Sequence, residues 1–238
     1  MLPEWQKAVV IRIEQATPNT RRYWLQLPET ERFDFKPGQF VTMDLPIHEK
    51  RNKRWRSYSI ASMPDGSNII ELVIVHLDGG LGTNYLFNDV ELGSELILRG
   101  PQGVFVLPDE LPENMFFICT GTGIAPFRSM LHYINTHNIP HGRLNLIFGT
   151  RRKDDLLYYD EMRELEEQIP DFTYFPVLSR ETWDNDTGYV HAIYERLCEG
   201  HPHAHFMLCG WKVMVDEAKQ RIQCMGYDRK DIHLELYG

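Results

Sequence analysis

Gly121-Thr122-Gly123-Ile124-Ala125-Pro126 is the stretch of sequence that decides the fold. It follows an apolar run at residues 115–119 and opens a helical pattern at residues 124–136. Glycine lets the backbone approach a ligand closely, and proline is favoured in the first turn of a helix. The stretch therefore predicts a strand, a tight turn and a helix, with open space over the edge of a sheet. Its spacing differs from the G-x-G-x-x-G dinucleotide fingerprint, so the turn alone does not identify a ligand.

The sequence after this turn continues to alternate between strands and helices. Apolar runs typical of buried strands are separated by patterns of helical period. This order predicts a parallel, doubly wound sheet, which binds ligands at the carboxyl ends of its strands. The predicted strands are residues 115–119, 144–148, 172–178, 206–209 and 232–236, and the predicted helices are residues 124–136, 155–168, 191–199 and 212–225.

The sequence before the turn consists of short runs in which apolar and polar residues alternate. Such runs, separated by turn residues, predict an antiparallel barrel or sandwich, with one short helix at residues 82–88. The segment Val106–Asn114 is rich in proline and acidic residues, which is typical of a surface connection, and it divides the chain into domains at residues 1–108 and 109–238. The predicted strands of the first domain are residues 8–13, 22–27, 39–45, 55–61, 69–76 and 95–99.

Composition excludes several classes of protein. A chain of 238 residues with 42% hydrophobic residues and no low-complexity tract is expected to fold into one or two globular domains. Its net charge of −9 argues against nucleic acid as a partner. Charged residues among the first fifteen positions predict no signal peptide, and the absence of a long apolar run predicts no membrane span, which together predict a cytoplasmic location. The cysteines are scattered singly, which predicts reduced thiols and no zinc or iron–sulfur site.

The most informative segment of the first domain is Arg56-Ser57-Tyr58-Ser59, which lies on a predicted strand. Residues two apart on a strand share a face, so Arg56 and Tyr58 point the same way. A guanidinium binds phosphate oxygens in pairs, and a phenol can stack on a flat ring. The segment therefore suits a ligand that has both a phosphate and an aromatic ring. The alternative is an ordinary surface strand with an arginine and a tyrosine packed across it.

A glycine-rich turn, Gly79-Gly80-Leu81-Gly82-Thr83, precedes the predicted short helix. Free backbone N–H groups and the positive end of the helix dipole attract an anion at such a position. Thr83 suits either a phosphate ligand or a helix cap. The turn therefore indicates a phosphate site, with a purely structural cap as the alternative.

Several motifs in order along the chain resemble those of the ferredoxin–NADP reductase superfamily, and the resemblance covers essentially the whole chain. It implies an antiparallel barrel that binds FAD at residues 1–108 and an α/β domain that binds NAD(P) at residues 109–238. The motifs are Arg56-Ser57-Tyr58-Ser59, Gly80-x-x-Thr83, Gly100-Pro101-x-Gly103-x-Phe105, Gly121-Thr122-Gly123-Ile124-Ala125-Pro126-Phe127-Arg128, Asp155-Leu156-Leu157-Tyr158, Ser179-Arg180, Cys209-Gly210-x-x-x-Met214 and Leu234-Glu235-Leu236-Tyr237.

The resemblance also implies a role for individual residues. Arg56 would contact the flavin diphosphate, Tyr58 would stack on the flavin ring, and Tyr237 would cover its other face and swing aside for the nicotinamide. The implied catalytic residues are Ser59, Cys209, Glu235 and Tyr237. The implied cofactor-binding residues are Arg56, Ser57, Tyr58, Ser59, Val75, His76, Gly80, Leu81, Gly82, Thr83, Thr122, Gly123, Arg151, Ser179, Arg180, Cys209, Gly210, Met214 and Tyr237.

The pair Ser179-Arg180 bears on the choice of nicotinamide cofactor. An arginine after the third parallel strand favours a 2′-phosphate, because NAD-specific folds often place an acid there for the ribose hydroxyl. Arg151 and Arg152, in Gly149-Thr150-Arg151-Arg152-Lys153, would reinforce this preference. Some members of the superfamily that use NADH keep a similar pair before a tryptophan-containing turn. We therefore predict NADPH, with NADH as the alternative.

The predicted function is electron transfer between NADP(H) and a separate one-electron carrier, a ferredoxin or flavodoxin, through hydride transfer to flavin N5. One alternative is an NADH-dependent reductase that serves an oxygenase component or free flavin. An alternative of another class is a flavin-binding accessory subunit without turnover of its own. No oligomeric state follows from the sequence.

Two charged or titratable segments have competing interpretations. The run Lys50–Arg56 has five basic residues in seven, which suits either a docking patch for an acidic carrier or an ordinary solvated loop. The histidines of HPHAH, residues 201–205, alternate before a strand. No carboxylate or cysteine accompanies them at ligand spacing, so we expect a loop and no metal site.

Overall fold

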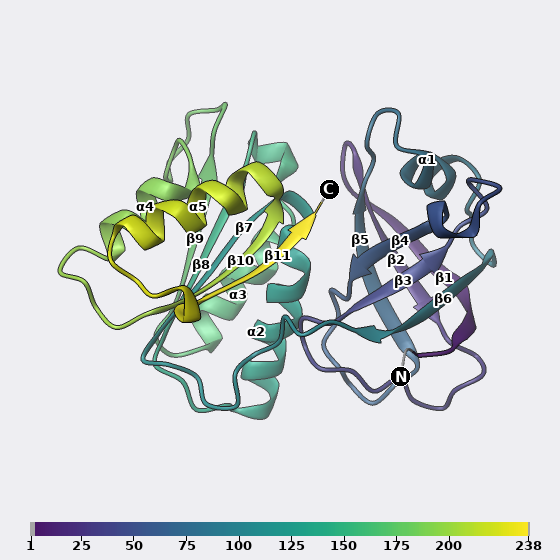
Figure 1. The fold of residues 1–238 in the computed structure, drawn as a ribbon, viewed down its shortest axis with the longest axis horizontal. Helices are drawn as coiled ribbons and strands as arrows, with labels where there is room; N and C mark the ends of the chain where they lie inside the picture. The colour runs from purple at the N-terminus through teal and green to yellow at the C-terminus, as the bar shows by residue number, and fades with distance from the viewer. Residues whose placement is uncertain (1–2, 238) are drawn as a thin grey trace.

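The computed structural model describes residues 3–237, which form two domains side by side (Figure 1). An antiparallel six-stranded sheet comes first, and a five-stranded parallel sheet covered by helices follows it. This architecture confirms the predicted fold class. The last strand of the barrel ends at Gln102 and the first parallel strand begins at Asn114, while the limits 1–108 and 109–238 stay a prediction.

The six strands of the first domain pair in the order β4-β3-β6-β1-β2-β5. An isolated antiparallel bridge between Ile60 and Leu72 brings the end of β4 against β5, so that the sheet curls toward a closed barrel. Alternate residues point into one apolar core, as the period of a half-buried strand requires. The elements are β1 (Trp5–Thr17), β2 (Thr20–Gln26), β3 (Phe40–Asp44), β4 (Trp55–Ser59), β5 (Ile69–Val75), α1 (Leu81–Asn88) and β6 (Glu95–Gln102).

The second domain is a parallel sheet with strand order β11-β10-β7-β8-β9. Helices α2 and α3 pack on one face of the sheet, and α4 and α5 pack on the other. Strands buried on both faces read as continuous apolar runs, which is why β7 and β8 were recognisable in the sequence. The elements are β7 (Asn114–Thr120), α2 (Ala125–His137), β8 (Arg143–Thr150), α3 (Tyr159–Gln168), β9 (Phe172–Leu178), α4 (Val190–Leu197), β10 (His205–Trp211), α5 (Lys212–Cys224) and β11 (Ile232–Tyr237).

Helix α2 lies between the parallel sheet and the barrel (Figure 1). It has Pro126 in its first turn and ends at His137, which is followed by Asn138 with a left-handed backbone. Phe127, on the first turn, is fully buried and packs its ring 5.8 Å from that of Phe105 in the barrel-side segment. Ala61 and Val73 of the barrel belong to the same apolar cluster. The two domains therefore share one core, which fixes the start of α2 against the barrel.

The described residues also bear on membrane spans, metal sites and thiols. Among residues 3–237, no helix combines the length and the apolar content needed to cross a membrane. Across the same residues, no group of three histidine, cysteine or acidic side chains is placed to hold a metal ion. All four cysteines are free thiols, and Cys224 is the exposed one. His201 and His203 lie in a loop that leads into β10, which begins at His205, and His201 stacks on Tyr227.

The shared core gives a stability prediction. We expect Phe127→Ala to lower the free energy of unfolding by about 3–5 kcal/mol, because it leaves a cavity between the domains. Urea unfolding followed by tryptophan fluorescence measures the change. Val104→Ala is the control, since Val104 is 95% exposed and its truncation removes no packing. A loss below about 1 kcal/mol for Phe127→Ala would contradict a shared core.

Candidate functional site

Two adjoining cavities lie where the barrel meets the carboxyl ends of the parallel strands. The barrel cavity, of about 720 Å³, is bounded mainly by β4, the end of β5 and the start of α1. The sheet cavity, of about 790 Å³, lies over the ends of β7, β8 and β9. Both volumes are typical of cofactor sites. Five residues line both cavities and so mark their junction: Val75, Leu77, Thr120, Thr122 and Trp211.

Arg56 is fixed in place at the wall of the barrel cavity. Its Nη1 donates to the carbonyl oxygens of Trp55 and Lys53, at 2.7 Å and 3.1 Å. A Cβ added to Gly82 would lie 2.9 Å from Arg56 Cγ, so glycine at this position is what lets helix α1 approach the arginine closely. The guanidinium is therefore held beside the first turn of α1.

The turn before α1 is held by its threonine. Thr83 Oγ1 accepts a hydrogen bond from the backbone N–H of Leu77 at 3.1 Å and donates to the carbonyl oxygen of Gly80 at 3.1 Å. Gly79 adopts a left-handed conformation, with φ of 74°, that glycine tolerates without strain. The turn and the adjacent Arg56 together place helix N–H groups and a cation at one end of the cavity, which suits a diphosphate.

Aromatic side chains from both domains line the barrel cavity. Tyr58 comes from β4, and Tyr237 comes from the end of β11. Burial raises the pKa of both hydroxyls, so each ring is a neutral phenol at neutral pH. Two neutral rings at one cavity suit a flat aromatic ligand.

A short hydrogen bond joins the two domains beside the cavity. Ser59 Oγ, at the end of β4, donates to Oε1 of Glu235 on β11 at 2.5 Å. Burial raises the pKa of Glu235, and the hydrogen bond from Ser59 partly offsets that shift. The carboxyl therefore holds its proton to a higher pH than an exposed glutamate does.

Cys209 lies beneath the junction of the cavities. It is fully buried, and burial raises the pKa of its thiol well above the ordinary value. The backbone around it is packed closely, because a Cβ on Gly123 would lie 2.4 Å from the Cys209 carbonyl oxygen. Gly210 similarly faces Thr120, whose Oγ1 would lie 2.6 Å from an added Cβ. Neither glycine has room for a side chain. At both positions the backbone itself therefore packs closely beside the junction.

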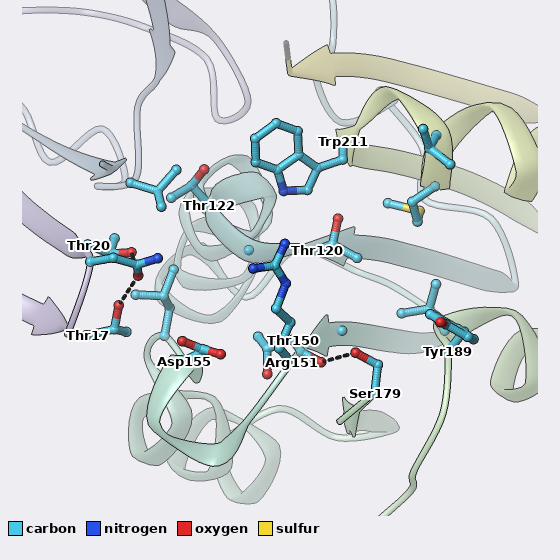
Figure 2. A pocket seen from close by; sticks show the side chains of 18 of the residues that line it. Thr17, Thr20, Thr120, Thr122, Thr150, Arg151, Asp155, Ser179, Tyr189 and Trp211 are labelled. Atoms are coloured by element: carbon cyan, nitrogen blue, oxygen red, sulfur yellow. Dashed lines mark hydrogen bonds between the residues drawn. The ribbon is translucent and has the colours of Figure 1, made fainter. Parts of the chain in front are cut away.

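Figure 2 shows the sheet cavity, with Arg151 projecting into it from the end of β8. Ser179, after β9, also lines the cavity and donates through Oγ to the carbonyl oxygen of Thr150 at 3.2 Å. Arg180 is exposed and is not among the lining residues. The acids Asp155 and Glu217 line the same cavity. Arg151 is thus the arginine that faces the space where a nucleotide would lie.

Most of the residues predicted from the sequence meet at these cavities. Those that line the barrel cavity are Arg56, Ser57, Tyr58, Ser59, Val75, Gly80, Leu81, Gly82, Thr83, Thr122 and Tyr237. Those that line the sheet cavity are Val75, His76, Thr122, Arg151, Ser179 and Met214. The others, Gly123, Arg180, Cys209, Gly210 and Glu235, line neither cavity. Gly210 packs against Thr120 and Glu235 bonds to Ser59, both of them lining residues, while Gly123 packs against the Cys209 carbonyl group.

Sequence reasoning missed several lining residues. Trp211 is 47% exposed and lines both cavities, and its position directly after Cys209-Gly210 at a strand end could have pointed to it. Thr120 precedes Gly121 and lies at the same junction. Asn19 reaches the sheet cavity from the β1–β2 turn, and no sequence motif marks it.

The cavities fit FAD and a nicotinamide nucleotide. The barrel cavity offers an arginine and a helix start for a diphosphate and two phenol rings for a flavin. At the junction, Thr120 Oγ1 is buried and has no hydrogen-bond partner within residues 3–237, so a polar ligand group would satisfy it. The donor set and the space therefore match these two cofactors.

Comparison with protein families supports this match. Residues 7–107 match the oxidoreductase FAD-binding domain, and residues 117–220 match the oxidoreductase NAD-binding domain. Ferredoxin–NADP reductase B of Sorangium cellulosum is 32% identical over 240 residues, which span 97% of each chain. The glycine betaine monooxygenase reductase subunit of Chromohalobacter salexigens is 27% identical, and the match covers 96% of this chain but 63% of that protein.

Solved structures show the same fold. The cytochrome P450 reductase GcoB of Amycolatopsis superimposes with a TM-score of 0.87 at 26% identity, over 98% of this chain and 70% of that one. A ferredoxin–NADP⁺ reductase from Neisseria gonorrhoeae, with bound FAD and NADP, gives a TM-score of 0.80 at 24% identity over 98% of both chains. The chain therefore belongs to the ferredoxin–NADP reductase superfamily and is an FAD-dependent NAD(P)H oxidoreductase.

Proposed function

We propose that this protein takes electrons from NADPH through bound FAD and delivers them to a separate one-electron carrier, a ferredoxin or flavodoxin. The observation that carries the proposal is the junction at Thr122 and Trp211, which line both cavities. When bound, FAD accepts a hydride and releases electrons singly, which links a nicotinamide to a one-electron acceptor. The protein holds the two rings in reacting position and excludes water.

The residues of the barrel cavity hold and orient the flavin. Arg56, Gly82 and Thr83 bind the diphosphate at the start of α1, and Tyr58 packs on the ring. Tyr237 lies at the junction side of the cavity and moves away when the nicotinamide enters. The domains that carry out the two binding tasks are residues 1–108 for FAD and 109–238 for NADPH.

Ser59, Glu235 and Cys209 act next to the reacting rings. Ser59 Oγ lies between the flavin site and Glu235, so the Ser59–Glu235 hydrogen bond offers a route for a proton to the flavin edge. The neutral Cys209 thiol packs beneath the nicotinamide and helps to fix its position. Each of these groups positions a ring or holds a proton.

Arg151 and Ser179 support NADPH as the reductant. Arg151 presents a guanidinium to the sheet cavity, and Ser179 stands where an acid would favour the ribose hydroxyl of NADH. The relative from Sorangium cellulosum, whose name includes NADP, agrees with this choice. Asp155 and Glu217 on the same cavity favour NADH, which keeps an NADH-dependent oxygenase reductase as the second candidate.

The visible spectrum tests the reaction and the choice of nucleotide together. We expect the flavin absorbance to bleach faster with NADPH than with NADH at equal concentration. Arg151→Ala should raise the KM for NADPH by about tenfold or more, because it removes a charge-assisted contact to phosphate, and leave the KM for NADH unchanged. Steady-state kinetics with both nucleotides measure this.

Arg143→Ala is the matched control, because Arg143 lies at the opposite end of the same strand, β8. It should leave both constants unchanged. Faster bleaching with NADH would favour the oxygenase-reductase alternative. The absence of bleaching with either nucleotide would favour an accessory subunit without turnover.

Glu235 gives a pH-dependence prediction. Its pKa is raised in the folded protein above the ordinary value of 4.5, so the unfolded chain releases this proton first as the pH rises. Well below pH 4.5 the residue is protonated in both states, so the folded protein buries no charge there. Above its folded pKa the folded protein buries a charged carboxylate, which lowers the free energy of unfolding. Glu235→Gln should therefore stabilise the protein more at pH 8 than at pH 4. Urea unfolding at both pH values measures the difference, and an equal effect at both would contradict the raised pKa.

The basic segment Lys50–Arg56 suits a docking patch for an acidic carrier. Arg51 and Arg54 form ion pairs with Asp44, and Arg56 turns to the barrel cavity. Lys50 and Lys53 are left exposed, and the Lys53 carbonyl oxygen bonds to Arg56 at the wall of the barrel cavity. These two lysines can attract a carrier to the flavin edge despite the net charge of −9.

We expect the double variant Lys50→Glu/Lys53→Glu to slow the reduction of ferredoxin or flavodoxin by about tenfold at low ionic strength, with the difference shrinking as salt is added. Stopped-flow assays over a salt series measure it. Lys230→Glu is the control, because Lys230 is exposed on the other domain. A rate that is independent of salt in the unmodified protein would exclude electrostatic docking.

A further inference from the structure

A cluster of charged side chains crosses the interface between the domains, away from both cavities. At its centre is Glu71 of β5, whose side chain is 3% exposed. Its carboxylate accepts hydrogen bonds from Arg22 Nε at 2.6 Å, Tyr158 OH at 2.8 Å and Arg128 Nη1 at 3.1 Å. Arg22 belongs to the barrel, whereas Arg128 and Tyr158 belong to the α/β domain. One buried carboxylate therefore binds both domains at once.

Arg128 is the side chain that completes this connection. It is 12% exposed, and its Nη1 also donates to the carbonyl oxygen of Ala61 in the barrel at 2.8 Å. Its Nε and Nη2 bind the two oxygens of Glu161 on α3 at 2.6 Å and 3.2 Å. The guanidinium lies over the ring of Tyr158 at 4.6 Å. All three guanidinium nitrogens therefore donate hydrogen bonds, and a lysine, which has one side-chain nitrogen, could not make all these contacts.

Glu71 shares β5 with Val75, which lies at the junction of the cavities, and Arg128 lies on α2, directly after the turn that contains Thr122. Glu71 is four residues before Val75 on β5, so the arm between them is about 13 Å at the strand rise of roughly 3.3 Å. Arg128 is on the first turns of α2, six residues after Thr122. A rotation of about 5° over that arm would shift the strand end by about 1 Å. A shift of about 1 Å at reacting atoms can cost about a hundredfold in rate.

We propose that Arg128 and Glu71 form a positioning clamp that sets the separation of the flavin and nicotinamide rings at the junction. The clamp acts through β5 and α2 and touches neither cofactor. The effect of the clamp on rate rests on the proposed function. The cluster would hold the domains at the relative orientation that hydride transfer requires.

The clamp differs from the apolar core that also joins the domains. Phe105, Phe127 and their neighbours bury nonpolar surface, which holds the domains together but tolerates small sliding movements. Hydrogen bonds to a guanidinium are directional and fix angles as well as distance. Loss of the clamp should therefore leave the domains associated and widen the range of their relative orientations.

The test compares Arg128→Met, which keeps the aliphatic stem, with Arg128→Lys, which restores the charge. Arg163→Met is the control, since Arg163 forms its ion pair with Glu166 inside the α/β domain and lines neither cavity. Glu71→Gln tests the other side of the clamp and replaces Arg128→Met if that variant does not fold. Rapid-mixing experiments measure the limiting rate of flavin reduction and the dissociation constant of the nucleotide separately.

We expect Arg128→Met to lower the limiting rate by about tenfold to a hundredfold, with the nucleotide dissociation constant and flavin content unchanged. Arg128→Lys should give an intermediate rate, and Arg163→Met should match the unmodified protein. A limiting rate unchanged in both Arg128→Met and Glu71→Gln would overturn the kinetic role. An effect confined to the dissociation constant would overturn it as well.

Domain orientation is measured without turnover by spin labels on native Cys224, which is the exposed cysteine, and on Leu92→Cys in the barrel, where Leu92 is 64% exposed. Pulsed electron–electron double resonance measures the distance between the two labels. Its distribution should be broader for Arg128→Met than for Arg163→Met. Equal distributions would overturn the clamp. If neither nucleotide reduces the unmodified protein, the proposed function fails, and the distance distributions still decide whether the clamp fixes the orientation.

Discussion

The packing of the first turn of α2 against the barrel is the constraint on which the rest of this structure depends. Phe127 fills the interface from the α/β side, and the turn Gly121–Ile124 directly precedes the helix that carries it. That turn is part of the wall that the two cavities share. Because the turn, the helix and the interface are contiguous in sequence, the position of the junction is set by how α2 docks.

The two kinds of sheet contribute differently to the site. Parallel strands all end at the same edge, so β7, β8, β9 and β10 bring their following turns together there. Antiparallel strands end at alternate edges, and the barrel contributes through β4, the end of β5 and the start of α1. The Ser59–Glu235 hydrogen bond joins these two edges beside the barrel cavity. The arrangement provides one cavity on each sheet, with residues that line both cavities between the sheets.

The secondary structure could be predicted from the sequence because each element buries one regular pattern of apolar residues. The segments Arg56–Ser59 and Gly80–Thr83 were found for a related reason, since their chemistry is contiguous. Trp211 and Asn19 were missed because their role arises from which turns meet in space. Ser179 and Arg180 illustrate the same limit, because neighbours in sequence point to different places and only Ser179 lines the cavity.

The charged cluster at Glu71 shows what polar groups contribute to a domain interface that apolar side chains of similar volume would not. Removing a carboxylate and two guanidinium groups from water is costly, and apolar substitutes of similar volume are often at least as stable. Their specific contribution is directional, because Arg128 bonds to Glu71, Ala61 and Glu161 in one orientation. Stability alone does not account for such a cluster between two domains that already share a core. A requirement for one fixed orientation does account for it, and hydride transfer between separately bound rings imposes that requirement.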